Sequence, residues 1–153
     1  MPTRITHFLH PSDVTGSEAV ATGFNTTARH THDLQSHLVA FQKNKRNYRG
    51  VIEGIHVLLT AGAGGSPPTK VTMRLCMDPE GDEVLVPDTE ATIVNGVTTA
   101  TKHSVAYSVQ LPIFQLTNLA DGGPGNGNLY LFIKVDDATQ SPVFARSIIT
   151  WME

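Results

Sequence analysis

The chain has 153 residues, enough for one domain whose hydrophobic core needs no disulfide or metal to hold it. Hydrophobic residues make up 40% of the chain and charged residues 16%, which is not the composition of an intrinsically disordered protein. The formal net charge of −3 argues against a dedicated nucleic-acid-binding protein.

Charge is distributed unevenly along the chain. Residues 1–50 carry six basic and three acidic side chains, net +3, whereas residues 51–153 carry five and eleven, net −6. Different neighbours are therefore expected for the two parts. The single cysteine, Cys76, excludes an internal disulfide and a multi-cysteine zinc site. No stretch approaches the ~18 apolar residues of a membrane span, and the start lacks the apolar region of a signal peptide, so we expect a cytoplasmic location or assembly.

The first 45 residues show no clear strand periodicity, and residues 1–29 are typical of an extended arm. Leu34, Leu38 and Phe41 have helical spacing, but HLVAFQ is equally compatible with a strand. We therefore predict an N-terminal arm at 1–45, with one short helix or strand at most, followed by a domain at 46–153.

Three histidines lie within HTHDLQSH, residues 30–37. His30 and His32 would share one face of a strand, and such ligands could hold zinc, iron or manganese. Cupins bind metal through an HxH pair followed shortly by Glu, but here Gln35, Ser36 and His37 stand nearby. The segment also precedes the predicted β body. We favour histidines on a polar arm, with no metal and no cofactor.

The run KNKRNYRG is the most suggestive local feature of the chain. Its basic side chains could bind a phosphate backbone or an acidic protein surface, or form a solvated turn. Because the body is acidic, protein docking or a solvated turn is favoured over nucleic acid. Apolar arm residues would gain from burial against a partner. The predicted partner-binding residues are Phe8, Leu9, Phe24, Lys43, Lys45, Arg46 and Arg49.

From residue 50 onward the pattern is β. Alternation with a period of two is clear in KVTMRLCM, SVAYSVQL and LYLFIKV, and the last is apolar on both faces. Less regular strands are expected at 51–60, 83–87, 91–96 and 142–152. Gly- and Pro-rich turns separate them. Seven or eight antiparallel strands without helices between them predict an all-β sandwich, and we favour a jelly roll.

No catalytic constellation is evident in the sequence. Cys76 and His103 would need contact in space to act as a pair, and an ordinary strand cysteine is the simpler interpretation. The acidic residues at 78–90 flank turns without the spacing of a calcium loop. DGGPGNGN lacks the Lys-Ser/Thr ending of a phosphate-binding loop. We therefore predict no enzyme activity.

An arm at 1–45, followed by strands that end in ARSIITWME, resembles the layout of the jelly-roll decoration (cement) proteins of tailed bacteriophages. The resemblance covers the architecture of most of the chain and rests on no specific motif. It implies a virion protein on the capsid surface, assembled in the host cytoplasm. Its implied partner is the major capsid protein, and its implied state is a homo-oligomer, with a trimer favoured.

Two other classes of function remain open from the sequence. One is another small virion component, such as a tail or head–tail part or a receptor- or sugar-binding β-sandwich. The other is a cupin-like metalloenzyme, which metal analysis of the pure protein would separate from the virion classes.

Overall fold

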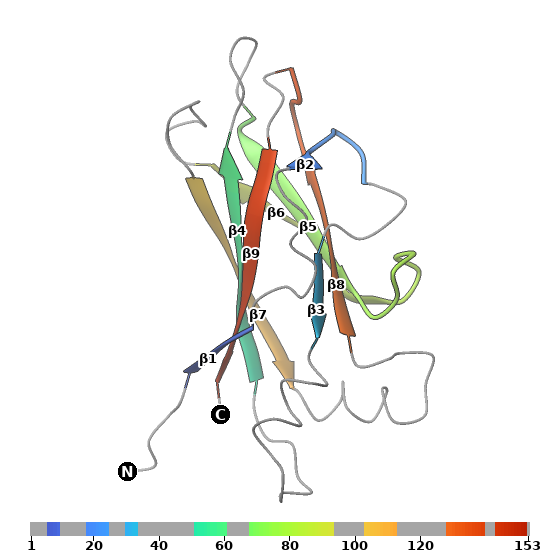
Figure 1. Cartoon of the computed structure of the whole chain (residues 1–153), viewed down its shortest axis with the longest axis vertical. Coiled ribbons are helices and arrows are strands. Elements are labelled where there is room, and N and C mark those ends of the chain that lie inside the picture. The colour runs from blue at the N-terminus through green and yellow to red at the C-terminus, as the bar shows by residue number, and fades with distance from the viewer. Residues whose placement is uncertain are drawn as a thin grey trace, which may run out of the picture.

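The computed structural model describes residues 6–9, 18–24, 30–33, 51–60, 68–93, 103–112, 128–139 and 143–152. Regular structure in these residues consists of β-strands (Figure 1). The strands are β1 (Thr6–Leu9), β2 (Glu18–Ala19), β3 (His30–Asp33), β4 (Val51–Thr60), β5 (Lys70–Cys76), β6 (Val84–Thr92), β7 (His103–Pro112), β8 (Asn128–Val135) and β9 (Val143–Met152). In this part of the chain there is no helix of the length and hydropathy needed to cross a lipid bilayer.

The strands form two antiparallel sheets that pack face to face (Figure 1). Sheet A has the order β1-β9-β4-β7, with β2 also paired to β9, and sheet B has the order β3-β8-β5-β6. Setting β2 aside, every connection crosses from one sheet to the other except that between β5 and β6. This interleaved order is that of a jelly roll, so the predicted all-β sandwich of the jelly-roll type is confirmed.

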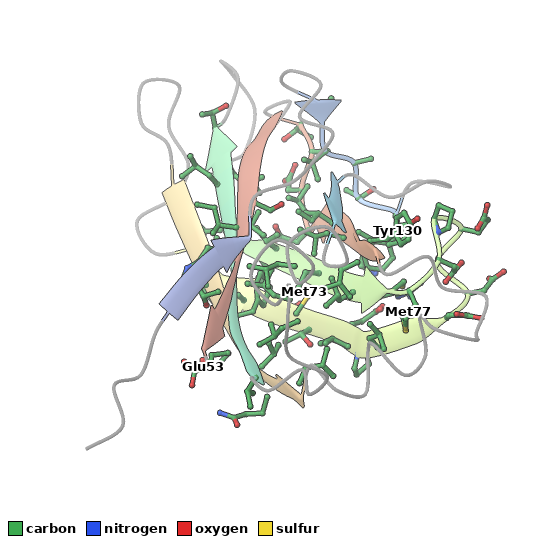
Figure 2. The ribbon with its side chains drawn as sticks, turned by 60° about the horizontal axis from the view of Figure 1, so that its bottom comes forward. Glu53, Met73, Met77 and Tyr130 are labelled. Atoms are coloured by element: carbon green, nitrogen blue, oxygen red, sulfur yellow. The ribbon has the colours of Figure 1, made fainter. Side chains whose placement is uncertain are left out.

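The core between the sheets is built from the alternating residues that the sequence pattern singled out. Sheet B contributes Val71, Met73 and Leu75 from β5, and sheet A contributes Val57 and Leu59 from β4, all fully buried. Figure 2 shows Met73 in the middle of the molecule, with Tyr130 and Met77 toward the turn that follows β5. Side chains on the inner faces are thus close-packed apolar groups, which is the main source of stability for such a sandwich.

Strand β8 is covered on both faces, as its sequence predicted. Leu131 and Ile133 lie in the core between the sheets, while Tyr130 and Phe132 are 6% and 2% exposed on the other face. A turn closes over part of that outer face, where a Cβ on Gly81 would lie 3.0 Å from Cζ of Phe132. Sheet B therefore has a second, smaller apolar cluster on its outside.

The sequence-based strand prediction needs one correction in the body. Strands were expected separately at 83–87 and 91–96, but the structure has the single strand β6, and residues 94–96 lie outside the described part. The described residues after position 50 therefore form six strands instead of seven or eight. Pro87 interrupts the apolar pattern, yet it is tolerated because β6 lies at the edge of sheet B.

A larger correction concerns the predicted arm at 1–45. Its described residues include β1 and β2, which pair with β9, and β3, which pairs with β8. The described residues of this part therefore contain three short strands, where one short helix or strand at most was expected. Strands of two to four residues are too short to show a period of two, and here the partner strands define them.

Residues 18–24 close one side of the sandwich, and we call them the strap. Glu18 and Ala19 pair with β9 of sheet A, while the carbonyl of Ala21 accepts a hydrogen bond of 3.0 Å from the backbone N–H of Val135 on β8. Between these two attachments, Val20 is buried in the main core. The strap therefore joins both sheets, and the side chain of Val20 is buried within its own chain.

Candidate partner-binding surface

The best-developed side-chain cluster on the outside of the described molecule surrounds Phe24 at the end of the strap. We call Phe24, Arg74, Asp88, Phe132 and Lys134 the Phe24 cluster. Strand register explains its assembly, because Arg74 on β5 lies opposite Phe132 on β8, and Lys134 follows two residues later on the same face. Alternation places all three on the outside of sheet B, since the residues between them fill the core.

Aromatic and cationic contacts hold Phe24 on this face. Its ring meets that of Phe132 edge to face, with centroids 6.5 Å apart and planes at 89°. Cζ of Arg74 lies 4.5 Å from the centroid of Phe24, and Nζ of Lys134 lies 4.7 Å from it. Cation–π contacts of this kind are worth roughly 0.5–1 kcal/mol at exposed sites. The cluster therefore attaches the strap to the sheet.

An ion pair completes the Phe24 cluster. Nε of Arg74 donates a hydrogen bond of 2.6 Å to Oδ1 of Asp88 on β6. This bond from Arg74 lowers the pKa of Asp88, with a smaller contribution from the nearby charge of Lys134. Positive charge from two strands thus lies beside a half-buried aromatic ring and one carboxylate. Such a surface suits protein contacts, because cations beside aromatic rings recur in interfaces.

The predicted partner-binding residues have different outcomes. Phe24 is half-buried against its own chain, so part of its apolar surface is already covered. Phe8 and Leu9 lie in β1, opposite Thr150 and Ile149 of β9. Lys43, Lys45, Arg46 and Arg49 lie outside the described residues. A role for these seven residues in partner binding stays a prediction.

Sequence reasoning missed Arg74 and Lys134 as parts of this surface. Both occupy positions opposite to the core-facing residues of their strands, which marks them as outward-facing. The signal that was lacking is the pairing of β5 with β8, because only this register places them beside Phe132.

The described part of the histidine segment, residues 30–33, lies in the sandwich, which corrects its predicted position on an arm before the β body. His30 and His32 belong to β3 and lie opposite Leu131 and Leu129 of β8. Residues 32 and 33 are therefore strand, while residues 34–44, for which helix and strand were both considered, lie outside the described part. Among the side chains that the structure describes, no group of three or more His, Cys, Asp or Glu residues could hold a metal ion.

Cys76 is fully buried as a member of the smaller apolar cluster, together with Tyr130 and Phe132. Its sequence pattern had placed it on the polar side of its strand, but this outer face is covered at that point. Burial raises the pKa of the Cys76 thiol to about 11, so the thiolate is scarce near neutral pH. His103 begins β7 in the other sheet.

Several carboxylates of the body are bound into its turns. Asp78 accepts hydrogen bonds from the backbone N–H groups of Asp82 and Glu83, at 2.9 and 2.5 Å, and so closes the turn after β5. Asp137 likewise accepts bonds from the backbone and hydroxyl of Thr139. These contacts give the two carboxylates a structural role at strand ends.

No protein-family model matches the sequence, and no curated protein matches it. Solved structures with a similar fold do exist. In the infectious bursal disease virus particle, one chain has 10% identity and a TM-score of 0.46, over 97% of this chain and 31% of that one. A chain in a virus-like particle of the extra small virus of the prawn Macrobrachium rosenbergii has 11% identity and a TM-score of 0.34. The match covers 98% of this chain and 78% of that one.

A third similar structure is the CBM22-1 xylan-binding domain of Xyn10C from Paenibacillus barcinonensis. It has 13% identity and a TM-score of 0.34, over 97% of this chain and 92% of that domain. The present chain spans about a third of the length of the infectious bursal disease virus chain.

Proposed function

We propose that the chain is a structural protein of a virus particle, and more narrowly a decoration protein that stabilises a tailed-bacteriophage capsid by binding the major capsid protein. The observation that carries this proposal is a jelly roll whose described interior is filled by buried, mainly aliphatic side chains from both sheets. Jelly rolls serve as capsid proteins, lectins and cupins. A filled interior favours the first of these uses over a cupin, which places its site between the sheets.

The chemistry of the described side chains also supports a binding role and no catalytic one. Cys76 is buried with a raised pKa, which disfavours nucleophilic attack. Asp78, Asp88, Asp136 and Asp137 are each bound to partners that hold turns or strands together. These groups stabilise the fold, which leaves outer surfaces and sheet edges as the places where partners would bind.

Docking on the capsid would use the N-terminal third of the chain. Residues 1–50 have a net charge of +3, and their basic run at 43–49 contrasts with the acidic body. Complementary charge mainly steers and orients docking, and its effect falls as salt rises. A homo-oligomer, with a trimer favoured, would present several such segments at once and so strengthen attachment.

The experiment uses particles from a genome that lacks the gene for this chain. The purified full chain is added to them, and attachment is measured by co-sedimentation and by electron microscopy of the labelled protein. We expect binding to the head that weakens with salt, together with a higher temperature of capsid disruption. A variant with Lys43, Lys45, Arg46 and Arg49 all changed to Ala should bind less at low salt.

A single-charge control is the variant Lys70→Ala, which removes an exposed positive charge, paired with Glu90, from the body instead of the N-terminal segment. It should attach as the natural chain does. Labelling at the tail would replace the decoration role with that of another virion component. No attachment to particles, together with absence of the chain from natural particles by mass spectrometry, would overturn the virion role.

A further inference from the structure

The outer strands of the two sheets differ in how well they are protected against pairing with another strand. In sheet A, β1 and the two-residue β2 lie along one edge and β7 forms the other, while β3 and β6 are the outer strands of sheet B. β1 and β3 have four residues each, whereas β6 has nine and β7 has ten. An outer strand presents backbone N–H and C=O groups that can pair with another chain, and a long strand presents more of them.

Strand β6 carries three features that oppose such pairing. Pro87 has no backbone N–H, so one donor is missing from its ladder. Its pairing with β5 shifts register twice, between Met73 and Leu75 and between Leu75 and Cys76. Asp88 and Glu90 are exposed along it, in ion pairs with Arg74 and Lys70 of β5, so a second β6 would have to pack against a row of charged side chains. The edge of sheet B at β6 is therefore protected.

Strand β7 lacks the charged residues and, before its last residue, the proline, and its pairing with β4 shifts register only once, between Ile52 and Gly54. Residues 103–112 contain no Lys, Arg, Asp or Glu, and their only proline is the last residue. Ala106, Ser108 and Gln110 are exposed on its outer face, between the buried Val105, Tyr107 and Val109. Within the described part of the chain, β7 pairs with β4 on one side and with no strand on the other (Figure 1).

We propose that β7 is a self-association edge, at which a second copy of this chain adds its own β7 in antiparallel orientation around a two-fold axis. A two-fold contact places the same strand on both sides, so a self-complementary edge is required. Strand β7 meets this requirement because it opposes no like charges in any register and its exposed side chains, Ala106, Ser108 and Gln110, are uncharged. Strand β6 does not meet it, because a second copy would have to pack against its row of charged side chains.

The pairing would join the two copies of sheet A into one continuous sheet. It uses β7 alone, so capsid binding does not depend on it. Combined with the three-fold contact of the favoured trimer, it gives a hexamer of two trimers in solution. The mass of any closed assembly that contains this contact is then an even multiple of the mass of one chain.

The test is the mass of the purified full chain by sedimentation equilibrium over a range of concentrations. We expect an even assembly for the natural chain. The double variant Ala106→Lys with Ser108→Lys places charges on the exposed face of β7 and should halve the mass. The variant Ala106→Glu with Ser108→Glu should halve it too. Mixing the two variants should restore the natural mass, because opposite charges then face each other.

Val84→Lys is the matched control, since Val84 is 46% exposed on the protected β6 and its substitution should leave the mass unchanged. Far-UV circular dichroism and urea midpoints confirm that each variant is folded. A natural chain that is a monomer or a trimer at every concentration would overturn the proposal. So would folded Lys variants that keep the natural mass, or a mixture that stays dissociated. No particles are used, so failure here is distinguishable from failure of the capsid-binding role.

Discussion

The hydroxyl of Tyr107 donates a hydrogen bond of 2.7 Å to the backbone carbonyl of Val71 inside the sandwich. Tyr107 lies on β7 of sheet A and Val71 on β5 of sheet B, so this buried bond links the two sheets directly. The rest of the described core is packed apolar side chains with little directional preference. The bond therefore helps to define how one sheet sits on the other.

Tyr107→Phe should lower the free energy of unfolding by about 0.5–1.5 kcal/mol, the usual net contribution of one such hydrogen bond. The ring remains, so packing and the dependence on denaturant should not change. Urea unfolding measures both, as the midpoint and the slope. An unchanged midpoint would show that the bond contributes nothing to stability.

The same variant changes the response to alkaline pH. Burial raises the pKa of Tyr107 above its ordinary value of 10.0, because the phenolate is disfavoured in the core. The stability from this group is therefore complete below pH 10 and falls above it, as the unfolded chain begins to ionise. Between pH 10 and 11, the natural chain should lose stability more steeply than Tyr107→Phe. Parallel curves would contradict this expectation.

Gly81→Ala should destabilise the protein by about 1–3 kcal/mol, for two reasons. The φ of Gly81 is 88°, which side chains rarely adopt, and a Cβ there would lie 3.0 Å from Cζ of Phe132. Gly23→Ala is the matched control, because a Cβ at Gly23 would meet nothing within 4 Å. Thermal unfolding gives the melting temperatures of the two variants, which are then compared. Equal melting temperatures would show that the turn relaxes without cost.

Asp136→Asn should make the free energy of unfolding less sensitive to a fall in pH. Burial by itself would raise the pKa of Asp136, but hydrogen bonds from the hydroxyl of Thr69 and the backbone N–H groups of Lys70 and Thr69 outweigh it, so the pKa is lowered. A lowered pKa gives stability that is complete above the ordinary value of 3.8 and is lost as pH falls through the folded value.

The advantage of the natural chain over Asp136→Asn should therefore be greatest near pH 7 and shrink below pH 4. The difference between the urea midpoints of the two proteins, taken from pH 7 to pH 2.5, measures this advantage. Glu80→Gln is the control, since it replaces an exposed turn carboxylate by the same kind of amide and should leave the urea midpoint at pH 7 unchanged. An advantage that stays constant down to pH 2.5 would show that the charge of Asp136 does not matter.

A chain shortened to begin at Tyr48 should lose at least about 3 kcal/mol of stability, and with it cooperative folding, because marginal domains have only 5–15 kcal/mol to lose. The deletion removes β1 and β2 from β9, β3 from β8, and Val20 from the core. Far-UV circular dichroism and urea unfolding provide the measurement.

Val20→Ala is the graded comparison for this deletion, with an expected cost of about 1–3 kcal/mol. A shortened chain that unfolds at the natural midpoint would mean that residues 1–47 are not needed by the sandwich. In that case their contribution would lie entirely in contacts with partners.

The Phe24 cluster could be predicted from the sequence only in part. Phe24 was identified from sequence as an apolar residue in need of burial, and the structure covers part of it with Phe132, Arg74 and Lys134 of its own chain. Nothing local to position 24 indicates these neighbours. The basic run at 43–49 is different, because its role depends on a partner and stays a prediction.

Five long strands of the body were predictable from sequence because alternation is a local property. Val71, Met73 and Leu75 face the core simply because each lies two residues from the next, and Tyr130 and Phe132 marked β8 as covered on both sides. Tertiary structure decided the remaining features, which are the short strands β1, β2 and β3, the single strand β6, the strap, and the register of β5 with β8. Each depends on hydrogen bonds or contacts between segments far apart in the chain, so their stability arises only when the partner segment is already in place.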